Sequence, residues 1–339
     1  MTAGWSEWWL LLLTALLAGV LSASLIRLIR PMLLEHVLAR PNARSSHKVP
    51  TPQGAGIAVI LATLVSAGFL LANRTGIGSD LALTVFGATA FIAAVGFADD
   101  IRPIPIWPRL LLQALAAGAL LAGSPGELRI VPAIPFWLER GLLLLAVLWF
   151  INLVNFMDGL DWMTAAEVVP VTATITMLGL SGEVPFSAAA VAAALCGAMI
   201  GFAPFNRPVA TIFLGDVGSL PIGLLLGWCL LQLAFHQHVA AALLLPLYYL
   251  ADASVTLLRR MVRGEPFWIA HRSHFYQRAT DNGFPVLRVV GEVFVLNLAL
   301  AALAIASIYL RSQASDVALS VVGATAVAFV LYRFSRKRS

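Results

Sequence analysis

The sequence has few charged residues. Only 12% of its 339 residues are Asp, Glu, Lys or Arg, about half the share found in soluble globular domains. Hydrophobic residues make up 60% of the chain, and its mean hydropathy is +0.89. This composition excludes an ordinary soluble enzyme. The net charge of +5 indicates no nucleic-acid partner, because basic loops beside anionic lipid headgroups account for it.

Cysteine is also scarce. The only two, Cys196 and Cys229, both lie inside apolar runs. Their number and spacing exclude a disulfide framework and a cysteine metal site. We interpret both as small buried hydrophobic side chains.

Long apolar runs replace the missing charge. Runs of roughly 18 to 22 residues match the ~30 Å hydrocarbon core of a bilayer, and helices satisfy their own backbone groups there. We predict an all-α polytopic integral membrane protein, a single transmembrane domain over residues 1–339, with about eleven transmembrane helices and ten as the alternative count. The expected spans are 8–28, 54–73, 81–98, 108–123, 140–156, 164–181, 186–203, 219–235, 239–258, 287–309 and 316–333.

The basic residues orient these spans. The first run is preceded by Glu7 and followed by Arg27 and Arg30, which indicates a signal anchor rather than a cleaved signal peptide. With the N-terminus periplasmic and the C-terminus cytoplasmic, 18 of the 22 Lys and Arg residues lie on or next to the inner side, as the positive-inside rule requires. The inner loops are then 27–53, 99–107, 157–163, 204–218 and 259–286.

Five aspartates fall on three of these inner loops. Asp99 and Asp100 end one span, Asp158 and Asp161 follow another, and Asp216 precedes a third. Two adjacent carboxylates at a helix C-terminus oppose the helix dipole, which favours a functional role over a solvated boundary. Carboxylates from several loops predict a hard divalent cation, Mg²⁺ with Mn²⁺ as the alternative.

Amides accompany the second acidic pair. Asn152, Asn155, Asp158 and Asp161 recur every three residues, which predicts one polar edge on a helix. Such an edge is costly in an apolar sequence unless it faces a site; hydrogen bonding between helices is the alternative. Around Asp216, the glycine-rich segment 215–219 opens a helix whose free N–H groups suit a phosphate, or it is a plain turn.

Basic side chains occupy two further inner loops. Lys48 follows His47 in one, and His271, Arg272 and His274 lie in the other. Because no Cys or Glu cluster accompanies the histidines, we favour the binding of phosphate anions by this loop over a soft-metal site or a solvated loop. Cation-binding carboxylates beside these groups predict a diphosphate substrate at the inner membrane surface.

Five motifs in this order carry a resemblance to a known family. They occupy residues 47–54, 99–100, 155–161, 213–219 and 271–278. The chain resembles the polyprenyl-phosphate N-acetylhexosamine-1-phosphate transferases, of glycosyltransferase family 4 type, which are related to phospho-MurNAc-pentapeptide transferase. The resemblance implies that the single domain transfers a hexosamine 1-phosphate from a UDP-N-acetylhexosamine to undecaprenyl phosphate with release of UMP, in the bacterial inner membrane. A homodimer is left open.

The last motif sorts the branches of the family. It reads His-Arg-Ser-His from His271 to His274 rather than three consecutive histidines, which resembles the O-antigen-initiating branch and implies the first lipid-linked step of lipopolysaccharide or related surface-polysaccharide synthesis. Two residues depart from the family pattern. Trp162 replaces a usual glycine, and Arg109 replaces a frequent lysine that is not equivalent to arginine at a phosphate.

Residue roles follow from the motifs and the resemblance. The expected catalytic residues are Asp99, Asp100, Asp158 and Asp216. The expected substrate-binding residues are Lys48, Asn152, Asn155, Asp161, His271, Arg272 and His274. The expected metal ligands are Asp216, Asp100 and Asp158. Asp99 is expected to position or deprotonate the lipid phosphate, and Asp158 is the alternative as a covalent nucleophile in a two-step route.

Two questions stay open at this point. Asp252 lies within a span, so it either forms a structural pair or lines the site. The main alternative function is a transporter of a phosphorylated or anionic substrate, whose site would lie near the membrane midplane. A non-catalytic assembly subunit would not need this set of acids.

Overall fold

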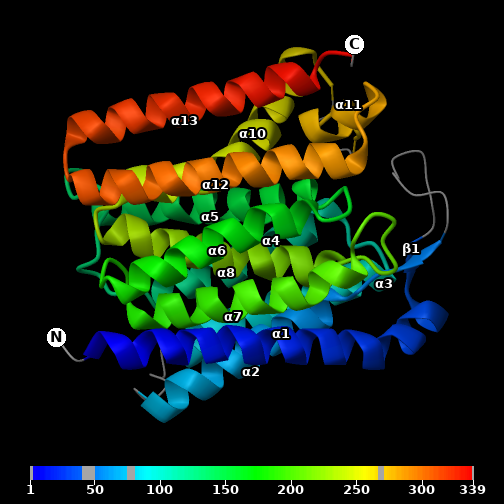
Figure 1. The fold of residues 1–339 in the computed structure, drawn as a ribbon, viewed down its shortest axis with the longest axis horizontal. Coiled ribbons are helices and arrows are strands. Elements are labelled where there is room, and N and C mark those ends of the chain that lie inside the picture. The colour runs from blue at the N-terminus through cyan, green and yellow to red at the C-terminus, as the bar shows by residue number, and fades with distance from the viewer. Residues whose placement is uncertain (1–2, 40–49, 75–80, 266–270, 338–339) are drawn as a thin grey trace.

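The computed structural model describes residues 3–39, 50–74, 81–265 and 271–337, with side chains from residue 7 and from residue 84 in the first and third ranges. His47 and Lys48 lie outside the described residues. Long helices run side by side along one axis (Figure 1). The elements are α1 Ala3–His36, β1 Leu38–Ala39, β2 Thr51–Pro52, α2 Gly56–Arg74, the π-helix η1 Leu81–Gly87, α3 Ala88–Ile101, α4 Ile106–Ala122, α5 Phe136–Met157, α6 Met163–Leu180, α7 Phe186–Phe202, the 3-10 turn η2 Ala203–Phe205, α8 Asp216–Phe235, α9 Val239–Leu244, α10 Leu247–Val262, α11 Phe275–Asp281, α12 Val286–Leu310 and α13 Gln313–Phe334.

The helices confirm an all-α polytopic membrane protein. In the described part of the chain, nine helices are long and apolar enough to cross a bilayer, and they match nine of the eleven expected spans. A tenth expected span, 108–123, forms the shorter helix α4 of 17 residues. The spans were recognisable because each apolar run is bounded by Gly, Pro or charged residues.

The remaining expected span, 239–258, is wrong as a continuous helix. It breaks into α9 and α10 at Leu245 and Pro246. Proline has no backbone N–H and its ring clashes with the preceding turn, so α9 ends there. The Pro246 carbonyl accepts from Leu250 N (2.9 Å) and begins α10.

The first helix is longer than expected. α1 continues through Pro31 to His36, although its expected span ends at residue 28. Arg27 and Arg30 therefore lie on the helix itself and extend it beyond the apolar run. Arginine has a high helix propensity, so the two arginines do not end the helix, which continues even through Pro31.

The most central helix is α8. The 18-residue apolar window of α8 is fully buried, whereas only 17% of the corresponding window of α13 is buried. Figure 1 shows α1 and α13 at opposite edges of the bundle with α8 between them. A helix buried on every side needs apolar residues all round, and α8 has them after its first turn. That first turn therefore lies where many helices meet.

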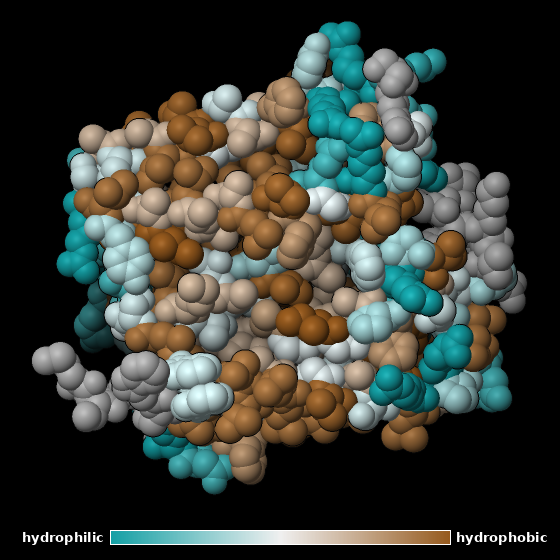
Figure 2. Space-filling view, in the orientation of Figure 1, coloured by the Kyte–Doolittle hydropathy of each residue, from teal (hydrophilic) through white to brown (hydrophobic). Residues whose placement is uncertain are grey.

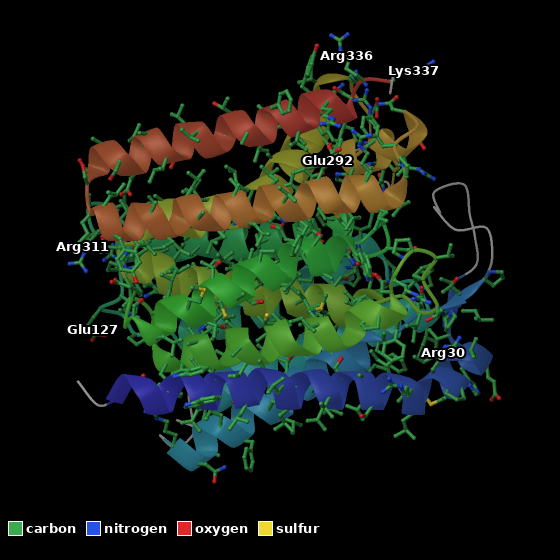
Figure 3. All side chains as sticks on the ribbon, viewed as in Figure 1. Arg30, Glu127, Glu292, Arg311, Arg336 and Lys337 are labelled. Atoms are coloured by element: carbon green, nitrogen blue, oxygen red, sulfur yellow. The ribbon has the colours of Figure 1, made fainter. Side chains whose placement is uncertain are left out.

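The surface is apolar along the bundle and polar at its ends. Figure 2 shows hydrophobic side chains over the middle of this face and hydrophilic ones toward both ends. Arg30, Arg336 and Lys337 lie toward one end, and Glu127 and Arg311 lie toward the other (Figure 3). A surface that is polar toward its two ends and apolar between them is typical of a chain that crosses a bilayer.

A short ribbon links two of the sequence motifs. β1 pairs antiparallel with β2, and the bridge that follows joins Gln53 to Phe213. Phe213 N donates to Pro52 O (2.8 Å), and Gly54 N donates back to Phe213 O (3.1 Å). These bonds attach the segment after Pro50 to the loop before α8. They also bring Gln53 to the first turn of α8.

Candidate active site

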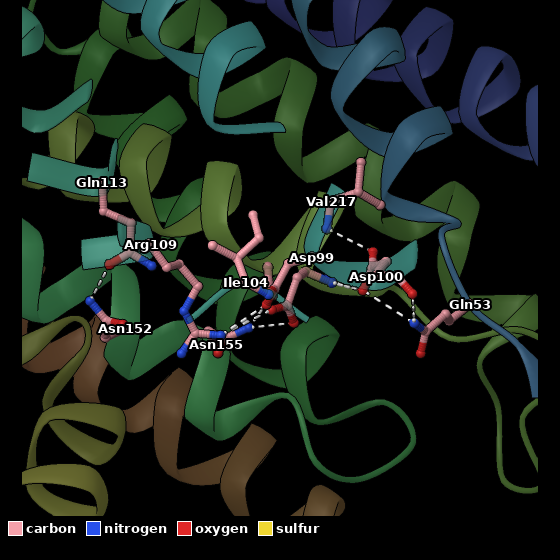
Figure 4. A network of polar contacts seen from close by, with 11 residues as sticks. Gln53, Asp99, Asp100, Ile104, Arg109, Gln113, Asn152, Asn155 and Val217 are labelled. Carbon is pink, nitrogen blue, oxygen red and sulfur yellow. Dashed lines mark hydrogen bonds and ion pairs between the residues drawn. The ribbon is translucent and has the colours of Figure 1, made fainter. Parts of the chain in front are cut away.

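Asp100 anchors the start of α8. Its Oδ1 accepts from Asp216 N (2.9 Å) and its Oδ2 accepts from Val217 N (3.0 Å). Gln53 Nε2 adds a bond to Oδ1 (3.3 Å), as Figure 4 shows. A carboxylate at a helix N-terminus satisfies free N–H groups and complements the dipole. The expectation that these N–H groups would hold a substrate phosphate is therefore wrong for Asp216 and Val217, because Asp100 already occupies them.

Glycines allow this close approach between α3 and α8. A Cβ on Gly215, whose φ is +78°, would lie 2.5 Å from Asp100 Oδ2. A Cβ on Gly96 would lie 2.3 Å from Asp216 O. Any larger residue at either position would push the two helices apart. The motif glycines thus place Asp100 against the helix that carries Asp216.

Asp99, Arg109 and Asp216 form a charged cluster at the same point. Arg109 Nη1 donates to Asp99 Oδ2 (2.9 Å) and lies 3.7 Å from Asp216 Oδ2. The two carboxyl groups are also in hydrogen-bond contact with each other. Ile104 N donates to Asp99 Oδ1 (2.5 Å). Two acids in contact share a single arginine, an arrangement that favours a proton or a further cation between them.

The two asparagines of the predicted polar edge of α5 point to different helices. Asn155 Nδ2 donates to Asp216 Oδ1 (2.8 Å) and to Ser219 Oγ (2.9 Å). Asn152 Nδ2 instead donates to Gln113 Oε1 on α4 (2.6 Å). Asn155 therefore joins the charged cluster. Asn152 forms the interhelical hydrogen bond that was the alternative interpretation.

Asp158 follows the end of α5 without a basic partner among the described residues. Thr164 Oγ1 donates a short hydrogen bond to its Oδ1. Burial raises the pKa of Asp158 to about 7, the bond from Thr164 opposes the rise, and the charges of Asp100 and Asp161 add to it. This carboxyl group therefore changes protonation near neutral pH, as a proton-transfer group requires.

The raised pKa of Asp158 predicts a pH-dependent stability. The folded protein binds this proton more tightly than the unfolded chain, so the stability of the metal-free protein should fall as pH rises from about 4 to about 7 and then level off. Asp158→Asn should remove the part of this pH dependence of stability that comes from Asp158. Thermal unfolding midpoints in EDTA at pH 5 and pH 8 measure it: the gain of the variant over the wild type should be clearly larger at pH 8 than at pH 5. An equal difference at both pH values would contradict the assignment.

Trp162 holds the loop before α8. Its φ is 65°, a left-handed conformation that costs a bulky residue about 1 kcal/mol. Trp162 N donates to Asn206 Oδ1 (2.8 Å), and the indole Nε1 donates to Ala203 O (2.6 Å). The preceding Asp161 is buried and accepts from Ala210 N through Oδ2 (3.0 Å). Both residues therefore fix residues 203–210 beside the site.

Asp252 organises the histidine motif. It is fully buried in α10 and accepts from Phe275 N (2.9 Å) and Tyr276 N (3.0 Å) at the start of α11. Tyr248 Oη donates to it (3.1 Å), and His274 Nδ1 lies 3.3 Å from Oδ1. The structural pair foreseen for Asp252 is thus with His274. The His274 side chain is only 4% exposed, so its ring is directed into the protein.

Tyr276 connects this motif to the Asp158 turn. The Tyr276 hydroxyl donates to Phe156 O (2.9 Å). A Cβ on Gly159 would lie 2.1 Å from the hydroxyl oxygen of Tyr276. Glycine at 159 is therefore needed for Tyr276 to reach the end of α5. The contact places α11 next to Asp158.

Arginines from α10 and the histidine motif line one cavity. The cavity has a volume of about 340 Å³, and its walls include Thr256, Glu265 and Ser273. Its arginines are Arg259, Arg260, Arg263, Arg272 and Arg278. The sequence indicated Arg272 as a site residue, but it indicated no role for Arg278 or for the three arginines on α10, because only the fold brings them together. Such a cavity attracts anions, phosphates above all.

The charges in this cavity are only partly compensated. Arg260 pairs with Glu265 (2.9 Å), and Arg272 pairs with Asp281 (3.1 Å). Burial lowers the pKa of Arg259, and the positive charges of Arg278 and Arg263 lower it further. Like charges held this close favour the binding of an anion between them.

The structure brings most of the predicted residues to one end of the bundle. Asp99, Asp100, Asn155 and Asp216 are joined by hydrogen bonds, and the charges of Asp100 and Asp158 interact. His271 lies at the histidine motif with its Nδ1 bonded to Ser273 Oγ (2.8 Å). Across the described ranges, no three His, Cys, Asp or Glu side chains are grouped as a ready set of metal ligands. The set Asp216, Asp100 and Asp158 remains a prediction.

Known proteins resemble this chain in the same region. Residues 82–234 match the model of the glycosyl transferase family 4. A probable undecaprenyl-phosphate N-acetylglucosaminyl 1-phosphate transferase from Bacillus subtilis (strain 168) is 26% identical over 277 residues, 76% of this chain and 75% of the relative. A phospho-N-acetylmuramoyl-pentapeptide-transferase from Clostridioides difficile (strain 630) is 25% identical over 284 residues, 76% of this chain and 84% of the relative. The matched region contains the Asp99–Arg109–Asp216 cluster, the Asp158 turn and the buried helix α8, so the site lies in the part of the chain that is similar to glycosyl transferase family 4.

Proposed function

We propose that this protein transfers an N-acetylhexosamine 1-phosphate from a UDP-sugar to undecaprenyl phosphate in the bacterial inner membrane. The observation that carries the proposal is the cluster of Asp99, Arg109 and Asp216, which two of the sequence motifs and the first turn of α4 build at one end of a membrane bundle. Both relatives are named as transferases of a phosphorylated sugar. We further propose one transferase domain over residues 1–339, with this end of the bundle cytoplasmic.

The reaction joins two anions. An oxygen of the lipid phosphate attacks the sugar-bearing β-phosphorus, the bond from that phosphorus to the UMP oxygen breaks, and UMP leaves with its electron pair. One phosphoanhydride replaces another, so the protein must lower the barrier by alignment and charge neutralisation. The acidic cluster and the arginine cavity at the same end of the bundle suit these two tasks.

The donor chemistry of the cluster fits a divalent cation. Among the described residues, Arg109 is the one basic side chain that pairs with Asp99 and Asp216, and carboxylate oxygens are the ligands that Mg²⁺ prefers. Asp216 would hold the ion, and Asp100 keeps the first turn of α8 in place for it. When bound, Mg²⁺ or Mn²⁺ would neutralise phosphate charge in the transition state.

The other residues divide between positioning and proton transfer. Asn155 orients Asp216 through its 2.8 Å bond. Asp99 already accepts from Ile104 and Arg109, so its part is to position groups rather than to take a proton. Asp158, with its pKa of about 7, is better suited to take a proton from the lipid phosphate or to act as the nucleophile of a two-step route.

The arginine cavity suits the diphosphate of the donor. Arg259, Arg263 and Arg278 face it and make no ion pair with a described carboxylate. A diphosphate carries several negative charges, and the paired N–H donors of an arginine guanidinium match the geometry of phosphate oxygens. This role extends the predicted phosphate-binding role of Arg272 to the end of α10.

One reconstitution tests the function. Purified protein in detergent or vesicles is incubated with undecaprenyl phosphate, Mg²⁺ and a panel of UDP-N-acetyl sugars, and UMP release and the mass of the lipid product are measured. We expect UMP release that requires both the lipid phosphate and the divalent ion, with one sugar preferred. A preference for a sugar of the O-antigen type would place the enzyme at the first lipid-linked step of surface-polysaccharide synthesis.

The same preparation tests the transporter alternative. A transporter is expected to have its site near the midplane, whereas these carboxylates lie at helix ends. Uptake of labelled UDP-sugar into vesicles without any UMP release would overturn the transferase proposal.

A further inference from the structure

A basic pocket lies between α1 and the loop before α8, outside the site described so far. It has a volume of about 260 Å³ and is lined by Arg27, Arg30, Pro31, Phe205 and Thr211. The first three residues belong to α1, Phe205 ends η2, and Thr211 lies between η2 and α8. The pocket therefore joins two parts of the chain that are far apart in the sequence.

The positive charge of this pocket is not compensated within the described part of the chain. None of the five lining residues is acidic, and neither arginine forms an ion pair with a described carboxylate. The Arg27 guanidinium lies over the Phe205 ring, 5.3 Å from its centroid, which orients the group but leaves its charge in place. The Nε of Arg30 is buried and has no hydrogen-bond partner among the described residues. Two such cations at one pocket favour a negatively charged ligand.

The arrangement of the two arginines suits a phosphate group. Arg27 and Arg30 are three residues apart on α1, so their side chains are neighbours on one face of the helix. Each guanidinium presents paired N–H donors, and a phosphate has enough oxygens to accept from both groups at once. Thr211 forms part of the wall, because its hydroxyl already donates to Phe205 O (2.9 Å). The arginines are therefore the groups that recognise the anion.

The pocket lies where the apolar outer face of α1 reaches the polar end of the bundle. Leu28 and Met32 flank the arginines and are 74% and 48% exposed. α1 runs along an edge of the bundle (Figure 1), and Arg30 lies toward its polar end (Figure 3). Exposed apolar side chains of a membrane helix face acyl chains, whereas arginines at the end of such a face reach the headgroups. A phosphate at this depth belongs to a lipid.

We propose that this pocket binds the phosphate of an anionic phospholipid through Arg27 and Arg30. A zwitterionic headgroup carries its own cation, so a headgroup with a net negative charge fits two uncompensated arginines better. The bound lipid would also hold the loop before α8, because Phe205 and Thr211 form the opposite wall of the pocket. This inference goes beyond the proposed transferase function and does not depend on it.

The binding test follows thermal unfolding of the purified full-length protein in detergent micelles as phosphatidylglycerol is added. Phosphatidylglycerol should raise the wild-type Tm by roughly 3 °C, and phosphatidylcholine should not. Arg27→Gln/Arg30→Gln should need about thirtyfold more phosphatidylglycerol for half of the effect, or about fivefold for each lost cation. Arg27→Lys/Arg30→Lys keeps both charges but loses the paired donors, so its requirement should fall between these two.

A matched control removes the same amount of charge elsewhere at this end of the bundle. Arg336 and Lys337 are exposed, lie toward the same end as Arg30 (Figure 3) and do not line the pocket. Arg336→Gln/Lys337→Gln should therefore respond to phosphatidylglycerol as the wild type does. A difference between the two double variants then reports the pocket and not the net charge of the protein.

Hydrogen exchange in the same micelles locates the bound lipid. In the wild type, phosphatidylglycerol should slow the exchange of the amides in residues 203–214 by about threefold, because the ligand opposes local opening of this loop. The amides of residues 310–316, which join α12 to α13, should exchange at an unchanged rate. Arg27→Gln/Arg30→Gln should show no slowing in either segment.

Several outcomes would overturn the proposal. An equal response of Arg27→Gln/Arg30→Gln and the wild type to phosphatidylglycerol would exclude these arginines as the ligands. An equal effect of phosphatidylcholine would exclude an anionic headgroup. Stabilisation by inorganic phosphate alone, lost in Arg27→Gln/Arg30→Gln, would assign the pocket to a soluble phosphate. If that double variant does not fold, the single variants Arg27→Gln and Arg30→Gln decide, each with a requirement about fivefold higher than that of the wild type. A failure of the proposed transferase function is distinguishable, because neither measurement uses UMP release.

Discussion

Asp216→Asn is expected to lower kcat by about a thousandfold while the protein still folds, because charge stabilisation in a transition state is commonly a large term. Asparagine has nearly the same size, and its carbonyl can still accept from Asn155, which now bonds to Asp216 Oδ1 at 2.8 Å. It loses the negative charge that faces Asp99 and Arg109. UMP release at saturating UDP-sugar and saturating Mg²⁺ measures the effect.

Two comparisons make this prediction specific. Glu127→Gln removes an exposed acid at the opposite end of the bundle (Figure 3) and should leave kcat unchanged. If Asp216 holds the divalent ion, Asp216→Asn should also raise the Mg²⁺ concentration needed for half-maximal activity. Full turnover by Asp216→Asn would remove Asp216 from the reaction.

Asp252→Asn is expected to have the second-largest effect, on stability as well as on activity. Asp252 accepts backbone bonds from both Phe275 and Tyr276, and an amide cannot accept through its nitrogen. One N–H group and His274 then lose a buried partner, which should cost about 3 kcal/mol. The loosened α11 would also release the Tyr276 contact next to Asp158. Thermal unfolding in detergent and UMP release measure the two effects.

Tyr248→Phe is the matched comparison for Asp252. It removes only the neutral hydroxyl that donates to Asp252 Oδ2 (3.1 Å) and leaves every backbone bond intact. We expect a loss of about 1 kcal/mol and nearly unchanged kcat. Equal losses in Tyr248→Phe and Asp252→Asn would mean that the backbone bonds at α11 carry little of the stability.

The sequence predicted the bundle and the meeting of its motifs because both depend on simple physical rules. Apolar length indicates spans, and alternating spans bring every second loop to the same end. Asp99, Asp100, Asn155 and Asp216 could therefore be assigned to one site from the sequence alone. The break between α9 and α10 follows from a similarly simple rule, because Pro246 lies in the expected span and proline interrupts a helix.

Side-chain directions were harder to predict. An α-helix turns about 100° per residue, so residues three apart shift by about 60° at each step. Asn152 and Asn155 consequently diverge, one toward Gln113 and the other toward Asp216. Asp161 lies beyond the end of α5 and follows no helical spacing at all. A period of three was too coarse to keep four polar residues on one edge.

Contacts between distant helices could not be predicted from local patterns. The attachment of Asp252 to α11, the arginine cavity and the bond from Asn297 to Glu167 each join residues from different helices or loops. Burial is the signal that reveals them: Glu167 and Asp252 are acids with no exposure to solvent. In the sequence alone, Asp252 was noticeable only as a charge within a span, and Glu167 was not noticed.

The conformation of Trp162 constrains how this site could change over generations. Glycine would adopt φ 65° without strain, yet it would lose the indole bond to Ala203 O. A return to glycine would thus relieve the backbone and at the same time leave one fewer bond on the loop before α8. Asn206, which accepts from Trp162 N, would then carry more of that attachment. Position 162 and the loop at 203–206 are therefore coupled through these two bonds, so that glycine at 162 trades backbone strain for a weaker attachment of the loop.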